Sequence, residues 1–228
     1  HAASVGLYRN LAYDPRTSFE PVMLASTTPM VLLAKKDLPA NTLQDVIALA
    51  RTRELTCGSA GVGSISHLTL LLFDKLASIK LRHVPYRGLS QTMNDLLGGQ
   101  IDIMFDQVIS ASPHIAGGDV RAVAVTGPTR AAAIPDVLTT AEAGLPELET
   151  IAWSALFFPK GTPNAIVVRI NAAMAEAMED KDVVARMAKL GADVPPPQAR
   201  SPEALGKLVR SEIDKWVPLI ASAELTAN

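Results

Sequence analysis

Residues 55–67 of this chain read Leu-Thr-Cys-Gly-Ser-Ala-Gly-Val-Gly-Ser-Ile-Ser-His, and an apolar helical run follows at 68–76. The pattern predicts a short buried strand, a turn rich in glycine and serine, and then a helix. The first-turn amides of a helix have no partner within the helix, and the helix dipole places positive potential beside them. No lysine or arginine lies within the stretch. The sequence therefore predicts a site where neutral donors recognise a small acid, carboxylate or phosphate, without converting it.

The turn does not match the common nucleotide or nucleophile motifs. Gly58 and Gly63 have the spacing of a phosphate-binding loop, but Ser64-Ile65 stands where a lysine and a serine or threonine should follow. The glycine order is the reverse of a dinucleotide fingerprint, and Cys57 takes the place of the first glycine of a nucleophile elbow around Ser59. Two interpretations stay open, an anion-binding loop and a tight turn that needs glycine for its dihedral angles.

The composition is that of an ordinary globular protein, and it excludes several classes of partner. Of 228 residues, 48% are apolar and 19% are charged, with a formal net charge of −2. This balance provides no basic surface for nucleic acid, and 4% aromatic residues provide few stacking platforms for bases. No uninterrupted apolar run reaches the roughly 20 residues that a bilayer span needs, and no signal peptide is recognisable in the sequence.

Strand-like and helix-like patterns alternate along the chain, which predicts an α/β protein with a largely parallel sheet. The expected strands cover 55–57, 80–84, 101–105, 120–126 and 150–158, together with 19–34 as two strands or one bent strand. The expected helices cover 43–51, 68–76, 90–97, 110–116, 164–179, a segment ending at 190, and 201 to about 222. Asn41 or Thr42 is expected to cap the helix at 43–51. Residues 130–148 are expected to form a loop with one short helix near 139–143, and residues 195–197 a stiff extended linker.

Small polar residues gather where the expected strands give way to loops. The four junctions are Gly58-Ser59, Pro85-Tyr86, Asp106-Gln107 and Thr126-Gly127. Ligands of open α/β sheets bind outside the carboxyl ends of the strands. The four junctions are therefore the expected position of the site.

Several single residues have both a functional and a structural interpretation. His67 contacts a ligand or bonds the neighbouring backbone, and Asp106 orients a ligand amine or hydroxyl through water or caps the following helix. Arg87 attracts an acid or faces solvent in a turn. Trp153 lines the site or packs in the core. Cys57, the single cysteine, excludes an internal disulfide and is expected to be a buried packing residue.

The sequence predicts neither a metal site nor a catalytic pair. His83 and His114 are isolated, and no H-x-E or C-x-x-C spacing accompanies them. No pair of titratable residues stands out as an acid and a base, which an enzyme normally needs. We therefore expect no catalytic residue, no metal and no cofactor.

Segments along nearly the whole chain resemble the tripartite tricarboxylate transporter receptor family, also called Bug solute receptors. The order and the spacing of the segments are those of the family. Each segment alone is a weak signal, whereas together they are highly specific. The matching segments are Leu7–Pro15, Gly58–Leu68, His83–Gly88, Asp95–Asp102, Met104–Asp106, Ala122–Thr126, Ala141–Pro146 and Pro159–Pro163.

The resemblance implies a two-lobed, periplasmic-binding-protein-like (type II) fold, with a first lobe at 1–30 plus 150–228 and a second lobe at 31–149. It implies a periplasmic receptor whose lobes close over a small organic acid and hand it to membrane permease subunits or to a sensor kinase. Family members bind di- and tricarboxylates, acidic amino acids or aromatic acids. The ligand-binding residues implied here are Ser59, Ala60, Gly61, Val62, Gly63, Ser64, Ser66, His67, Tyr86, Asp106 and Trp153.

One departure from the family concerns the start of the chain. Family members begin with strand–helix units, one of which carries a glycine-rich ligand loop, and these have no counterpart before His1. The first lobe is therefore expected to be incomplete at its N-terminus, in a fragment or in a truncated gene product. Two other functions stay open, the ligand-sensing effector domain of a transcriptional regulator and an acyl- or phosphoryl-transferring enzyme on the same scaffold.

Overall fold

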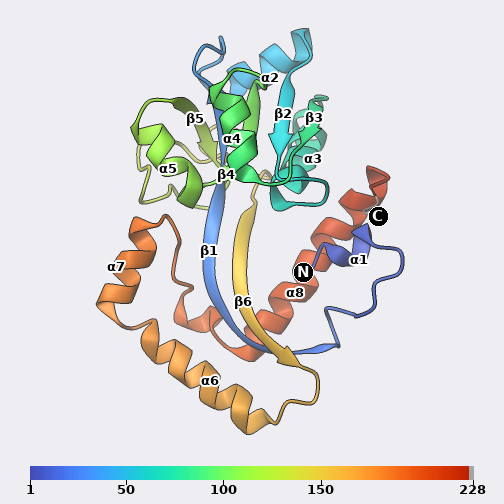
Figure 1. Ribbon diagram of the computed structural model, residues 1–228, viewed down its shortest axis with the longest axis vertical. Helices are drawn as coiled ribbons and strands as arrows, with labels where there is room; N and C mark the ends of the chain where they lie inside the picture. The colour runs from blue at the N-terminus through green and yellow to red at the C-terminus, as the bar shows by residue number, and fades with distance from the viewer. Residues whose placement is uncertain (226–228) are drawn as a thin grey trace. The chain divides into compact units, whose positions relative to one another are not determined.

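The computed structural model describes residues 1–225, and residues 226–228, the end of the expected first lobe, lie outside the described part of the chain. Strands and helices alternate along the sequence, which confirms the α/β class (Figure 1). The strands are β1 (Phe19–Lys35), β2 (Thr56–Ser59), β3 (Arg82–Pro85), β4 (Ile103–Gln107), β5 (Val120–Val125) and β6 (Ile151–Pro159). The helices are α1 (Ser4–Leu7), α2 (Leu43–Thr52), α3 (Ile65–Ala77), α4 (Leu89–Leu97), α5 (Val108–Ala116), α6 (Asn164–Ala177), α7 (Lys181–Lys189) and α8 (Pro202–Ser222), with a 3-10 turn at Pro197–Ala199.

The strands form a mixed sheet in the order β3-β2-β4-β1-β5, and β6 pairs with β1. β2 is parallel to β3 and to β4, whereas β1 is antiparallel to β4 and to β5. The expectation of a largely parallel sheet is therefore wrong. Strands joined by a helix that returns the chain to the same end of the sheet are parallel neighbours. β1 instead runs antiparallel to β4 and β5, with which it pairs over a long sequence separation.

The chain divides into two compact units. Unit 1 comprises His1–Thr27 and the chain from Trp153 onward, and unit 2 comprises Thr28–Ala152. β1 contributes residues to both units, because the division falls within it between Thr27 and Thr28. Unit 2 contains all of the strand-to-loop junctions that the sequence indicates as the site.

The middle of unit 2 is the apolar run of β1. Residues 30–34 are all fully buried. Met30, Leu32 and Ala34 pack in one cluster with residues of α2 and α3, whereas Val31 and Leu33 pack in a second cluster with residues of α4 and α5. Successive side chains of a strand point to opposite faces, so helices cover both faces of the sheet here. Burial on both faces explains why this segment is apolar at every position instead of at every second one.

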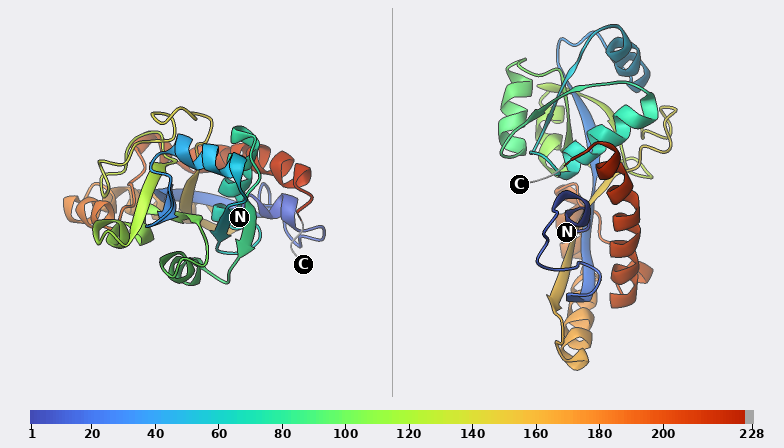
Figure 2. Two further views of the ribbon diagram at one scale, coloured as in Figure 1. Left: turned by 90° about the horizontal axis from the view of Figure 1, so that it is seen from above. Right: turned by 90° about the vertical axis from the view of Figure 1, so that its right-hand side faces the viewer.

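Unit 1 is organised around α8. Leu205, Val209 and Ile213 of this helix are buried in a cluster with Ala2 and with Leu24 of β1. Figure 2 shows α8, in red, along the unit 1 part of β1. A second apolar cluster contains residues of β1 and α6, together with Met178, the residue that follows α6. Every residue of α7 remains at least partly exposed, so this unit is less completely buried than unit 2.

Most of the expected elements are confirmed, and one is wrong. β1 is a single long strand, one of the two alternatives that the sequence left open. The expected helix near 139–143 is a turn. Thr139 and Glu142 exchange hydrogen bonds as at a helix start, but Gly144 adopts a φ of +90° and the turn ends there. Residues 195–196 are extended as expected, and the chain then enters the 3-10 turn.

Candidate functional site

The loop between β2 and α3 depends on two glycines. Gly61 has a φ of +113° and Gly63 a φ of +77°, which side-chain-bearing residues rarely adopt. A Cβ on Gly61 would also lie 3.0 Å from the carbonyl oxygen of Tyr86. These glycines let the chain turn sharply after Ser59, the last residue of β2, and enter α3 at Ile65.

Serine hydroxyls hold the loop from within. Ser64 is the N-cap of α3, where its Oγ accepts a hydrogen bond from the N–H of His67 (3.3 Å). The same hydroxyl donates to the carbonyl oxygen of Gly61 (2.7 Å) and lies 3.0 Å from the hydroxyl of Ser66. The Ser66 hydroxyl accepts from the N–H of Ala60 (3.0 Å). The loop is therefore pre-shaped by its own hydroxyls.

Three amides of the loop and helix start are not hydrogen-bonded in the described part of the chain, although Ser66 is almost completely buried. Within residues 1–225, the N–H groups of Val62, Ile65 and Ser66 have no hydrogen-bond partner, and those of Ile65 and Ser66 belong to the first turn of α3. Val62 is 47% exposed at the tip of the loop. First-turn amides together with the positive end of the helix dipole stabilise an anion. The arrangement can therefore bind a carboxylate without a cationic side chain.

Two histidines lie beside this loop and stack on each other. The rings of His67 on α3 and His83 on β3 are 3.8 Å apart with an angle of 7° between their planes. The N–H of Gly63 donates to Nδ1 of His67 (3.1 Å), which is the backbone bond that the sequence left as one alternative for this residue. Burial, and then the neighbouring His83, lowers the pKa of His67 to about 4, and burial also lowers the pKa of His83.

The sequence did not indicate a role for His83. Its Nε2 atom lies 2.6 Å from the hydroxyl oxygen of Ser59. No spacing in the sequence indicates this pair, because it arises from the parallel pairing of β2 with β3. A serine at that distance from a histidine has the geometry of a nucleophile and its base. However, Ser59 is fully buried, and its hydroxyl also accepts from the N–H of Gly61 (3.2 Å). The pair therefore supports the loop and offers no surface to a substrate carbonyl.

Tyr86 holds the β2 end of the loop from the next junction. Its N–H donates to the carbonyl oxygen of Ser59 (2.9 Å), and its hydroxyl donates to a carboxylate oxygen of Asp95 (2.7 Å). Partial burial, together with Asp95, raises the pKa of Tyr86 to about 12, so the phenol stays protonated. The structure thus gives Tyr86 a supporting position against the loop.

Asp106 ends β4 and is almost completely buried, at 1% exposure. Its Oδ1 accepts from the N–H of Gln107 (2.7 Å) and from the hydroxyl of Ser110 (2.6 Å), so it holds the first turn of α5. A cavity of about 160 Å³ lies beside it, lined by residues of α4 and α5 that include Asn94 and His114. Burial raises the pKa of Asp106 above its usual range. The structure therefore gives this residue the capping contacts and also a position on a cavity wall.

The sequence also singled out Trp153, Arg87 and Cys57. Trp153 belongs to unit 1, where it packs near Leu205 and Val209 and its Nε1 donates to Glu212 (3.3 Å). Arg87 is exposed, the second of its two alternatives. Cys57 is fully buried in the core of unit 2, which confirms its packing role, and burial raises the pKa of its thiol well above the usual range.

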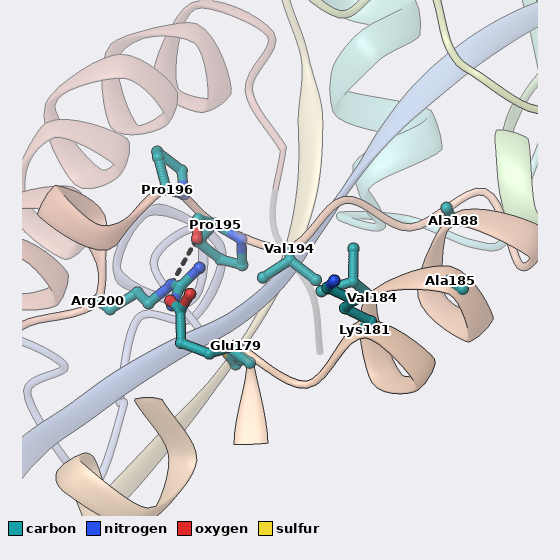
Figure 3. Close-up of a pocket in the computed structure, with 10 residues that line it drawn as sticks. Glu179, Lys181, Val184, Ala185, Ala188, Val194, Pro195, Pro196 and Arg200 are labelled. Atoms are coloured by element: carbon teal, nitrogen blue, oxygen red, sulfur yellow. Dashed lines mark hydrogen bonds and ion pairs between the residues drawn. The ribbon is translucent and has the colours of Figure 1, made fainter. Parts of the chain in front are cut away.

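A larger cavity of about 460 Å³ lies in unit 1, between the end of α6, α7 and the segment 194–196 (Figure 3). Its lining is mostly apolar. The guanidinium of Arg200 is already engaged there, because Nε donates to the carbonyl oxygen of Pro195 (2.7 Å) and Nη1 pairs with Glu179. Arg200 therefore has a structural role in this cavity, and Lys181 is the other basic residue in its lining.

The described residues provide no cluster for a metal. Among residues 1–225, no group of three or more histidine, cysteine, aspartate or glutamate residues is arranged to hold a metal ion. The same part of the chain contains no helix with the length and apolar character that a membrane span requires.

Comparisons with known proteins agree on one family. The family model described as tripartite tricarboxylate transporter family receptor matches residues 2–225. The UPF0065 protein of the tcbD-tcbE intergenic region of Pseudomonas sp. (strain P51) is 38% identical over 97% of this chain and 66% of its own length. MatC from Rhodopseudomonas palustris, solved with bound malate, is 38% identical with a TM-score of 0.85, over 96% of this chain and 75% of its own. Rpa4515 from R. palustris, solved with adipate, is 30% identical with a TM-score of 0.86, over 97% of this chain and 74% of its own.

The matches cover this chain almost completely but cover the relatives only in part. The chain spans 66% and 65% of the length of two curated relatives. It spans 75% and 74% of the two solved structures with malate and adipate.

Proposed function

Because the chain belongs to the tripartite tricarboxylate transporter receptor family, we propose that it is a periplasmic receptor that binds a small organic acid at the loop between β2 and α3. The observation that carries the proposal is the set of partnerless N–H groups of Val62, Ile65 and Ser66 at the start of α3. The proposal gives the residues Ser59–Ser66 the role of the carboxylate-binding loop. It includes no catalytic step.

The donors present are sufficient for useful affinity. A hydrogen bond to a charged group contributes about 1.5–3 kcal/mol net. Micromolar binding corresponds to about 8 kcal/mol, so a few such bonds together with apolar contacts reach it. The serine hydroxyls already fix the loop, so little conformational entropy has to be lost when the acid binds.

Dicarboxylates are the first ligands to test. MatC was solved with malate and Rpa4515 with adipate, and both match nearly all of this chain. Asp106 supports a ligand that carries a hydroxyl or an amine, because a buried carboxyl accepts such groups directly or through water. Delivery to the permease subunits of a tripartite transporter, or to a sensor kinase, is part of the same proposal.

Isothermal titration calorimetry on the full-length protein tests the proposal, with malate, adipate, glutamate and benzoate as ligands. We expect at least one of these acids to bind with micromolar affinity. Ser64→Ala should weaken that acid by roughly tenfold, because the helix cap and the bond to Gly61 are both lost.

Ser211→Ala is the matched control, because this exposed serine on α8 donates only to the carbonyl oxygen of Leu208. It should bind as the wild type does. Equal affinity of Ser64→Ala and Ser211→Ala would show that the acid binds elsewhere on the protein.

A further inference from the structure

The stacked histidines raise a question that the binding role of the loop does not answer. His67 is buried and His83 half-buried beside the loop, and within residues 1–225 no carboxylate pairs with either ring. His67 is 2% exposed, and its ring lies 3.8 Å from that of His83. Burying polar groups costs free energy unless each is hydrogen-bonded, so the partners of these rings show what the pair does.

The hydrogen bond to Gly63 fixes the proton on His67. In a neutral imidazole one nitrogen donates and the other accepts. The N–H of Gly63 donates to Nδ1 over 3.1 Å, so Nδ1 carries no proton and Nε2 carries it. A charged imidazolium has no acceptor nitrogen, so a second proton on His67 would remove this bond.

The surroundings keep His67 uncharged. The titratable group facing it from the neighbouring elements of the described chain is His83 on β3. His83 faces Ser59 of β2 in addition to His67. Burial and the neighbouring ring both disfavour the charged form, which places the pKa of His67 at about 4.

We propose that His67 is a positioning residue for acid binding: its bare Nδ1 fixes Gly63, and with it the unbonded amide of Val62, while His83 holds the imidazole in place by stacking. The role rests on the acid-binding function proposed for this loop. Gly63 stands between the unbonded amide of Val62 and the cap residue Ser64. Because glycine adopts positive and negative φ about equally, an anchor outside the residue helps to select its φ of +77°. Nδ1 is that anchor.

Two consequences follow for the behaviour of the protein with pH. Acid binding should be strongest while His67 is neutral and should weaken as the pH falls toward 4. The pKa of His67 is lower in the folded protein than its ordinary value of 6.5, so the unfolded chain binds more protons between these values. The contribution of His67 to folding stability is therefore complete above pH 6.5 and is lost as the pH falls toward 4.

Two substitutions separate the acceptor from the ring. His67→Phe keeps an aromatic ring for stacking and removes the acceptor, whereas His67→Asn places Oδ1 near the position of Nδ1 and cannot titrate. Calorimetry with malate and, if malate does not bind, with adipate, glutamate and benzoate should give at least tenfold weaker binding for His67→Phe and a change below about threefold for His67→Asn. A His67→Phe variant that binds as tightly as the wild type would overturn the proposal.

Nuclear magnetic resonance on the free full-length protein supplies a readout that needs no ligand. At pH 7 the ¹⁵N shifts of His67 should show an unprotonated Nδ1, and the Gly63 amide should exchange slowly with solvent. The protection of the Gly63 amide, taken relative to the intrinsic exchange rate at each pH, should fall at least tenfold in His67→Phe, and in the wild type on lowering the pH through about 4, but His67→Asn should not show this pH effect.

The two readouts distinguish the two proposals. If none of the four acids binds the wild type, the acid-binding proposal fails, whereas slow exchange of Gly63 with a bare Nδ1 still supports the anchor. A protonated Nδ1 at pH 7, or an equally protected Gly63 amide in His67→Phe, overturns the role of His67 even if the acids bind.

Discussion

Unit 2 contains two strand-to-helix junctions that run in the same direction and behave in opposite ways. β2 and β4 are parallel neighbours, so their carboxyl ends lie at the same edge of the sheet. After β2, a glycine-rich loop precedes α3 and leaves amides without partners. After β4, α5 begins at the next residue. The carboxyl of Asp106 accepts hydrogen bonds from the N–H of Gln107 and from the hydroxyl of Ser110.

The difference shows how one sheet edge can combine opposite chemistries. Where the helix start keeps its donors free, the junction attracts an anion. Where a buried aspartate accepts from the N–H just before the helix and from a hydroxyl of its first turn, the junction presents an acceptor instead. We therefore expect a ligand with a carboxylate toward the first junction and a hydroxyl or amine toward the second.

The largest effect is expected from Gly61→Ala, which tests whether the first junction depends on its turn. The added Cβ would lie 3.0 Å from the carbonyl oxygen of Tyr86, on a backbone with a φ of +113°. Moving the loop to relieve this contact displaces the amide of Val62, and acid binding should fall by about a hundredfold or more. Calorimetry measures the loss.

Gly99→Ala is the matched control for that substitution. Gly99 also has a positive φ, +71°, but a Cβ there would meet no described atom within 4 Å. Both variants should lose about 1–2 kcal/mol of stability from the strained backbone. Only Gly61→Ala should lose acid binding, and an equal loss in both would show that binding follows general stability instead of the shape of the loop.

A smaller effect is expected from Asp106, which tests the second junction. Asp106→Ala leaves the N–H of Gln107 without its acceptor and the hydroxyl of Ser110 with only the carbonyl oxygen of Gln107, and the free energy of unfolding should fall by about 1–3 kcal/mol. Asp106→Asn keeps an oxygen acceptor and should cost clearly less. Urea unfolding followed by circular dichroism would compare the two variants. Equal losses of unfolding free energy would show that the carboxyl oxygen of Asp106 does not stabilise the start of α5 as an acceptor.

The smallest effect is expected from Asp74, on the same helix as the first junction but near its other end. Burial raises the pKa of Asp74 from 3.8 to about 7, and its carboxyl accepts from the N–H of Leu81. The folded protein therefore binds more protons than the unfolded chain between these values, so this group makes stability fall as the pH rises from about 4 to 7.

Asp74→Asn removes the charge and keeps an acceptor for Leu81. Its urea midpoint should exceed that of the wild type at pH 8 and approach it at pH 4, while acid binding at pH 8 stays unchanged. The same midpoint difference at both pH values would contradict the titration of Asp74. A loss of acid binding would show that the two ends of α3 are coupled. The difference between the two junctions would then depend on the whole of α3 and not only on its first turn.

Local sequence predicted the elements whose signals are local. Thr42 was one of two expected caps for α2, and its hydroxyl accepts from the N–H of Asp45 while the carboxylate of Asp45 accepts from the N–H of Thr42. The expected helix near 139–143 failed for a local reason as well, since Gly144 ends the turn before a second turn can form. The direction of β1 against β4 and β5 carries no local signal, because pairing over a long sequence separation sets it.

The sequence by itself determined the strand, the glycine turn and the helix that follows them around residues 55–77, because dihedral preferences and hydrophobic periodicity act over a few residues. It also placed the chain among the tricarboxylate transporter receptors, whose segments lie in the same order. Only the tertiary structure brought His83 onto His67 and Ser59, because this contact depends on the register of β2 with β3. Only the tertiary structure gave Asp106 its cavity and its bonds, since burial is a property of packed elements and not of a motif.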